Sequence, residues 1–180
     1  MKQKAIQGFT LIELAVVVFI TVLITTISVA EYREAEQRKK VVIARDMITQ
    51  SLRSAQLFAI TGRQTNNAVP TCRTPEYYSI RFQHVPTFSI AARNNCGTND
   101  VIDNFTLPSG INIDDIGFDG GVAHSIEIRF YLPNGRMRGV RNNGPEVDFT
   151  SAQVIVDEDA NNDNYLDVRI NSLTGQIGDK

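Results

Sequence analysis

The most restrictive feature of this chain is an apolar run near its N-terminus. Residues 14–30 are seventeen consecutive residues without a charge, rich in Val, Ile and Leu. With residues 9–12 the run covers 22 residues and is interrupted only by Glu13. About 20 apolar residues cross the hydrocarbon core of a bilayer as a helix. The run therefore predicts a transmembrane helix, and Lys2 and Lys4 before it predict a cytoplasmic N-terminus.

A cleavable secretory signal peptide is the alternative interpretation of this run. The apolar region of such a peptide has about 7–15 residues and ends at a small-residue cleavage site. The run here is longer, and no such site closes it cleanly. Ionisable residues inside membrane segments are costly and usually functional, which makes Glu13 a candidate site residue. The alternative for Glu13 is a side chain that reaches back to the cytoplasmic interface.

The amino-acid composition and the motifs that are missing exclude several classes of protein function. The chain has 180 residues, of which 42% are hydrophobic and 21% charged, so it can form a packed domain and is not disordered throughout. Two Cys and two His are too few for a zinc finger or an iron–sulfur ferredoxin. The sequence has no glycine-rich phosphate loop and no His pair of metal-binding type, and nothing places its Ser, His and Asp residues together. We therefore predict that the protein is not an enzyme.

The helix is expected to continue beyond the apolar run, through residues 31–63. This segment lacks proline, and its only glycine is Gly62, which suits a left-handed helix end. Apolar residues recur at every third or fourth position, the pattern of one buried helical face. They are Val41, Ala44, Ile48, Leu52, Ala55 and Ala59. We predict one helix over residues 9–61, whose second half packs on the downstream strands; a short coiled-coil seam is the alternative.

From residue 64 onward the pattern is that of short strands separated by turns. Alternating apolar residues predict strands at 77–83, 87–92, 125–132, 136–141, 153–156 and 165–170. Weaker signals cover 101–107 and 111–118, and a last short strand follows residue 175. Because strands and helices do not alternate, the strands should be antiparallel. The predicted fold class is α+β, a long N-terminal helix packed on an antiparallel β-sheet head.

The start of the apolar run resembles a known processing motif. It reads Gly8-Phe9-Thr10-Leu11-Ile12-Glu13-Leu14, and a short basic leader precedes it. This combination closely resembles the prepilin peptidase motif of type IV pilins and type II secretion pseudopilins. The resemblance implies cleavage between Gly8 and Phe9, N-methylation of Phe9, and Glu13 as the assembly residue. The α-amino group released on a neighbouring subunit can neutralise the Glu13 carboxylate, and this pairing rewards docking in register.

The same resemblance implies a pilin-like fold and a domain organisation. The segments are a prepilin leader (1–8), a transmembrane assembly helix (9–30), its amphipathic continuation (31–63) and a periplasmic β-rich head (64–180). The protein would be a single-pass bacterial inner-membrane protein with a cytoplasmic N-terminus, and part of a filament after assembly. Its implied partners are the prepilin peptidase, the inner membrane and other pilin or pseudopilin subunits.

Three further segments, 52–62, 130–136 and 171–177, resemble the H-type minor pseudopilins and their type IV pilus relatives. The resemblance implies a minor pilin or pseudopilin, a structural subunit of a type II secretion or type IV pilus filament that acts by protein–protein contacts. Two alternatives stay open: a DNA-binding minor pilin that serves DNA uptake, and a major filament subunit.

The DNA-binding alternative depends on arginines. Some relatives bind DNA through a Gly-Arg-x-Arg motif near the C-terminus, and the corresponding stretch here, residues 175–178, lacks both arginines. Residues 135–138 fit the motif but belong to a different predicted strand, and residues 64–180 carry nine Arg and Lys against fifteen Asp and Glu, a net charge of −6. Arg136, Arg138 and Arg141 are the candidate nucleic-acid residues, solvated arginines being the alternative, and nucleic acid is not the expected partner.

Two other features of the head invite a prediction. Cys72 and Cys96 are the only cysteines, and export to an oxidising compartment favours a disulfide between them over two free thiols. Oxygen-bearing side chains recur at every second residue, as at the start of a calcium loop. They are Asp157, Asp159, Asn161 and Asp163, with Asp167 as a further candidate.

This segment differs from a typical calcium-binding loop at two positions: it lacks the glycine of the sharp turn and the acidic residue at the twelfth position. A long polar hairpin turn rich in Asn and Asp is the alternative. Any calcium would be structural, and no other cofactor is predicted.

Overall fold

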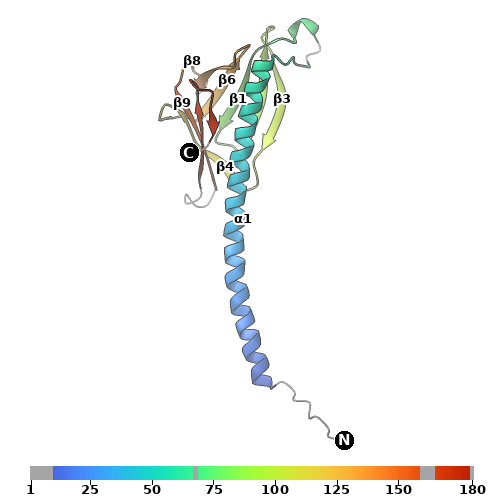
Figure 1. Ribbon diagram of the computed structural model, residues 1–180, viewed down its shortest axis with the longest axis vertical. Coiled ribbons are helices and arrows are strands. Elements are labelled where there is room, and N and C mark those ends of the chain that lie inside the picture. Colours follow the sequence, from blue (N-terminus) through green and yellow to red (C-terminus); the bar gives the residue numbers. More distant parts are fainter. Residues whose placement is uncertain (1–9, 67–68, 159–164, 179–180) are drawn as a thin grey trace. The chain divides into compact units, whose positions relative to one another are not determined.

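Helix α1 (Leu11–Thr61) is one continuous helix of 51 residues in the computed structural model, which describes residues 10–66, 69–158 and 165–178 (Figure 1). It begins at Leu11, where Thr10 caps it: Thr10 Oγ1 accepts a hydrogen bond from the Glu13 N–H at 3.3 Å. Residue 9, where the predicted helix begins, lies outside the described residues. At the other end Gly62 adopts a left-handed φ of 63°, and the Arg63 N–H donates to the Phe58 carbonyl at 3.2 Å. The predicted glycine stop is therefore confirmed.

The chain divides into two compact units, Met1–Arg38 and Lys39–Lys180. In the described part of the first unit, the side chains of residues 10–26 and 31–38 are all exposed. The buried core lies wholly in the second unit, between Val41 and Ile177. The second unit thus contains the C-terminal half of α1 together with every strand.

A six-stranded antiparallel sheet in the second unit has the order β3-β2-β1-β6-β7-β8 (Figure 1). Its strands are β1 (Pro75–Gln83), β2 (Thr87–Asn94), β3 (Asn99–Thr106), β6 (Ser125–Tyr131), β7 (Arg136–Arg141) and β8 (Glu146–Val147). A short 3-10 helix, η1 (Pro70–Cys72), precedes β1. The register places Ile128 of β6 between Ile80 of β1 and Gly139 of β7.

The remaining strands form a second antiparallel sheet of five strands in the order β11-β10-β9-β4-β5. They are β4 (Ile111–Phe118), β5 (Gly121–Val122), β9 (Ser151–Glu158), β10 (Leu166–Asn171) and β11 (Ile177–Gly178). The α+β class and the antiparallel arrangement are confirmed. The head has two sheets, however, and the two-residue strands β5 and β8 were not predicted because two residues show no alternation.

One hydrophobic core joins α1 to the strands. The six residues of the predicted helical stripe are each at most 2% exposed. The ring of Phe58 on α1 lies 5.7 Å from that of Tyr78 on β1. Between the sheets, a Cβ on Gly139 would come within 2.5 Å of the Phe118 ring of β4. Only glycine lets β7 and β4 approach this closely, so the sheets pack face to face.

Candidate functional site

The N-terminal half of α1 presents apolar side chains in all directions. Every side chain from residue 10 to residue 26 is exposed, with Leu11 at 86% and Phe19 at 65%. A window of 18 residues has a mean hydropathy of 2.5, so the helix is long and apolar enough to cross a membrane. A helix that is apolar on all faces is stable only when an apolar medium or other helices cover it.

The threonines of this segment satisfy their own hydroxyl groups. Thr21 Oγ1 donates to the Val17 carbonyl at 2.6 Å. Thr25 and Thr26 both donate to the Val22 carbonyl, at 2.9 Å and 2.8 Å. Hydrocarbon offers no hydrogen-bond partners, so a hydroxyl bonded to its own helix is the arrangement that such a medium tolerates.

Glu13 is the only ionisable residue between residues 10 and 30. It lies in the first turn of α1 with an exposed side chain, and its backbone N–H is capped by Thr10. The partial positive charge at a helix N-terminus favours a carboxylate in this turn. Gly8 and Phe9, the predicted cleavage and methylation site, lie outside the described residues.

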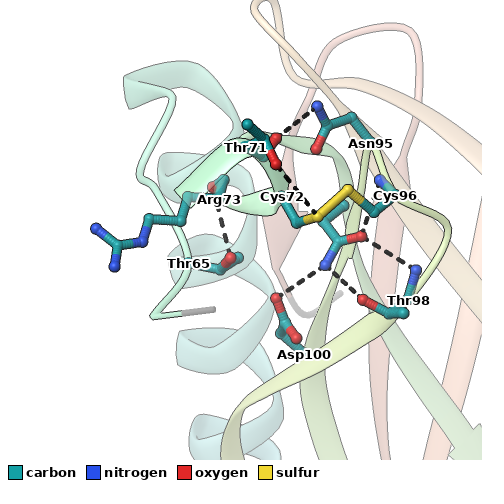
Figure 2. The surroundings of a disulfide bond; sticks show 9 residues. Thr65, Thr71, Cys72, Arg73, Asn95, Cys96, Thr98 and Asp100 are labelled. Atoms are coloured by element: carbon teal, nitrogen blue, oxygen red, sulfur yellow. Dashed lines mark hydrogen bonds between the residues drawn. A yellow bond between two sulfur atoms is a disulfide. The ribbon is translucent and has the colours of Figure 1, made fainter. Parts of the chain in front are cut away.

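The disulfide prediction is confirmed. Cys72 and Cys96 are bonded with Sγ atoms 1.98 Å apart, and the bridge joins η1 to the turn between β2 and β3 (Figure 2). Asn94 beside it is fully buried, and its Oδ1 accepts hydrogen bonds from the Cys96 N–H (3.1 Å) and the Thr98 N–H (3.0 Å). The turn that carries Cys96 is thus fixed by side-chain bonds as well as by the bridge.

The three candidate nucleic-acid arginines of β7 are engaged within the head. Arg136 and Arg138 both pair with Asp148, at 3.3 Å and 3.1 Å, and Arg138 also lies 3.5 Å from Glu146. Arg141 donates to the Phe118 carbonyl at 2.8 Å. Carboxylates therefore lie beside the exposed Arg136 and the half-buried Arg138, which weakens the field that a phosphate backbone would meet.

A polar and aromatic cluster lies beside these arginines on the outer face of the six-stranded sheet. The Arg129 guanidinium stacks over the Tyr77 ring at 4.7 Å and pairs with Glu127 at 3.0 Å. The Tyr131 hydroxyl donates to Glu146 at 2.6 Å. Burial, together with this bond to a carboxylate, raises the pKa of Tyr131 to about 12.

Three of the five predicted calcium ligands, Asp159, Asn161 and Asp163, lie outside the described residues. Asp157 is buried at the end of β9, and Asp167 of β10 pairs with Arg169 at 2.6 Å. Within residues 10–66, 69–158 and 165–178, no three His, Cys, Asp or Glu side chains are grouped to hold a metal ion. The calcium site stays a hypothesis that depends on residues 159–163.

Sequence reasoning missed a groove between α1 and the β10–β11 hairpin. It has a volume of about 790 Å³, and Arg53 and Gln56 of α1 line one side of it. The other side is formed by Arg169 and the hairpin residues up to Gly178. Residues 53 and 169 are far apart in the sequence, and only the packing of the helix on the hairpin brings them together.

Comparison of the chain with protein-family models, with curated proteins and with solved structures finds no match.

Proposed function

We propose that this chain is a minor pilin or pseudopilin, a structural subunit of a type II secretion or type IV pilus filament. The observation that carries the proposal is the segment of residues 10–26 in α1, which is apolar and exposed on every face and contains Glu13 as its only ionisable group. The motif around Gly8 and Phe9 adds the processing step. The α+β fold with one long N-terminal helix and antiparallel sheets is compatible with a pilin-like subunit.

The helix gives this subunit two environments. Before assembly, lipid of the bacterial inner membrane covers residues 10–26, with the N-terminus in the cytoplasm and the head in the periplasm. In the filament, the helices of neighbouring subunits cover the same surface. The carboxylate of Glu13 is costly in both apolar environments, and the α-amino group freed by cleavage before Phe9 neutralises it. A subunit docked out of register leaves that charge unpaired, so the pair selects the correct position.

The hydrophobic core supports the proposed passage of the helix from lipid into the filament, because it does not include the apolar N-terminal segment of α1. Among the described residues, all buried apolar side chains lie between Val41 and Ile177, and none lies in residues 10–26 or 31–38. The head can therefore stay folded while the helix passes from lipid into the filament. Its role is protein–protein contact, and the minor status is inferred from the resemblance of residues 52–62, 130–136 and 171–177 to the H-type subgroup.

Processing is the first test. The chain is co-expressed with a prepilin peptidase, and the intact mass of the membrane-extracted protein is measured. We expect a methylated N-terminus at Phe9 and loss of Lys2 and Lys4, which changes the formal net charge from −2 to −4. A matched chain with Gly8→Leu should keep its leader. Full-length protein beginning at Met1 in assembled filaments would contradict the proposal.

Assembly is tested with Glu13→Gln, and Glu31→Gln on the same helix serves as its control. Cleavage should continue in both variants, because neither changes the residues on either side of the cut. Incorporation into sheared filaments should fall at least tenfold for Glu13→Gln alone, the size expected for loss of one charge-assisted pair in an apolar setting, about 1.5–3 kcal/mol. Equal incorporation of both variants would refute the assembly role of Glu13.

A further inference from the structure

The groove between α1 and the β10–β11 hairpin has the features of a built binding surface. Its volume of about 790 Å³ is large enough for several side chains of a bound segment. Its lining includes Ile170 and Ile177, which are both buried, and residues 175–178 of the β10–β11 hairpin. Among the described residues, an added Cβ at Gly178 would meet no atom within 4 Å.

The charged residues that line the groove in the described part of the chain are both arginines. Arg53 and Arg169 are among its lining residues, and no lining residue is acidic in the described part of the chain. The positions three and four residues from Arg53 on α1 carry Thr49, Gln50, Gln56 and Leu57, so its own helix supplies no counter-charge. Arg169 gives its Nε to Asp167 at 2.6 Å, so its charge is partly balanced.

Within the described residues, Arg53 is held in place by one of its N–H donors and keeps the others for a ligand. One of its terminal nitrogens donates to the Ile177 carbonyl at 3.0 Å, which ties the guanidinium to the edge strand β11. Gln56 reaches the Gly175 carbonyl one turn further along, at 3.5 Å. A guanidinium has five N–H donors in a planar fork, and this fork matches a carboxylate. Arg136 and Arg138 differ, because both already face Asp148.

We propose that this groove binds an extended acidic segment of a neighbouring subunit, with a carboxylate on Arg53. The neighbour as the source of the segment depends on the filament function proposed above, whereas the chemistry of the groove does not. Charge complementarity favours this partner, because residues 64–180 have a net charge of −6, so a head of similar composition offers many carboxylates to a cationic groove. Arg169 already has Asp167 beside it, so it is chiefly the charge of Arg53 that needs an acid when a neighbour covers the groove.

The binding test uses the full chain in nonionic detergent and needs no filament. The probe is a fluorescein-labelled peptide with the sequence of residues 156–167 of this chain, its most acidic stretch. The matched control peptide has Asn for Asp and Gln for Glu. We expect the acidic peptide to bind and the control peptide not to bind. Equal binding of both peptides, or no binding of either at millimolar concentration, overturns the proposal.

Protein variants locate the site. Arg53→Glu should weaken the binding of the acidic peptide at least tenfold, about the loss of one charge-assisted hydrogen bond. Arg53→Lys should keep part of the affinity, and Arg136→Glu, a matched arginine on β7, should keep all of it. Thermal unfolding of each variant verifies that the fold is retained. An equal effect of Arg53→Glu and Arg136→Glu overturns the proposed location.

Competitors identify the class of anion. Inorganic phosphate and a short single-stranded DNA are added to the complex of chain and acidic peptide. We expect neither to displace the peptide at matched charge concentration. Displacement by DNA at lower concentration would make the groove a nucleic-acid site and overturn the proposal. If the chain proved not to enter filaments while the peptide still bound Arg53, the filament function would fail and the groove chemistry would stand.

Discussion

The two halves of α1 use the same apolar amino acids for opposite purposes. From Leu11 to residue 26 they point in every direction and are exposed. From Val41 to Ala59 they recur at every third or fourth position and are buried against the strands. A helix that is apolar all round has its partner outside the chain, and a striped helix has its partner within it. The transition from all-round to striped apolar surface therefore separates a segment that is long and apolar enough to cross a membrane from the unit that contains the buried core.

The largest effect expected from this difference comes from one matched pair of leucines. Leu52 is fully buried, whereas Leu23 is 50% exposed in the N-terminal half. Leu52→Ala should lower the free energy of unfolding of the head by about 2–5 kcal/mol, because it leaves a cavity in the core. Leu23→Ala should change it by less than about 0.5 kcal/mol. Denaturant unfolding of the full chain in nonionic detergent measures both; equal losses would mean that the two halves are not distinct.

Removal of the disulfide tests how much the covalent bridge within the head contributes to its stability. Removal of the bridge by Cys72→Ser with Cys96→Ser should cost about 3 kcal/mol of stability, since the bridge closes a loop with a separation of 24 residues. A reductant should lower the unfolding midpoint of the unmodified chain by a similar amount and leave the double variant unchanged. If reductant and substitution both left the midpoint where it was, the bridge would contribute nothing to the head.

Local patterns predicted much of this fold. The helical stripe, the end of α1 at Gly62 and the strands β6 and β7 follow from spacing and turn residues within a few positions of one another. The division of the strands into two sheets does not, because pairing such as Asn112 with Asp157 joins residues far apart in the sequence. Strands β5 and β8 are too short for any alternation.

The candidate site divides in the same way. The pair of cysteines is a local signal, and the disulfide it predicted is confirmed. The cleavage motif and the assembly role of Glu13 are local signals as well, and they stay predictions. The carboxylate partners of Arg136 and Arg138 depend on how the segment around Asp148 folds back toward β7, which no local pattern specifies. The groove at Arg53 is even harder to predict from the sequence, because it forms only when α1, β10 and β11 pack together. The one local hint was an arginine on α1 without an acid three or four positions away.

Alkaline pH should destabilise the fold through the polar cluster that contains Tyr131. The pKa of Tyr131 is raised from 10.0 to about 12 by burial and by its bond to Glu146, so the folded chain holds this proton more tightly than the unfolded chain does. Its contribution to stability is complete below pH 10 and is lost as the pH rises through about 12. Tyr131→Phe should remove this part of the pH dependence, while Tyr32→Phe on the N-terminal half should not. Identical pH profiles of the unmodified chain and Tyr131→Phe would refute the assignment.

The smallest effect on stability is expected from calcium. Its addition tests whether the folded head needs an ion from outside the chain. Asp157 and Asp167 are the two predicted ligands that the structure describes, and Asp167 already has Arg169 as its counter-charge. A polar turn rich in Asn and Asp forms without an ion, because these residues tolerate left-handed backbone conformations. Millimolar calcium and excess chelator should then give the same midpoint of thermal unfolding. A midpoint that rises with calcium, and no longer rises after Asp163→Asn, would establish the metal site instead: the acids of residues 157–163 would then need an ion to offset their mutual repulsion, and the head would not be complete by itself.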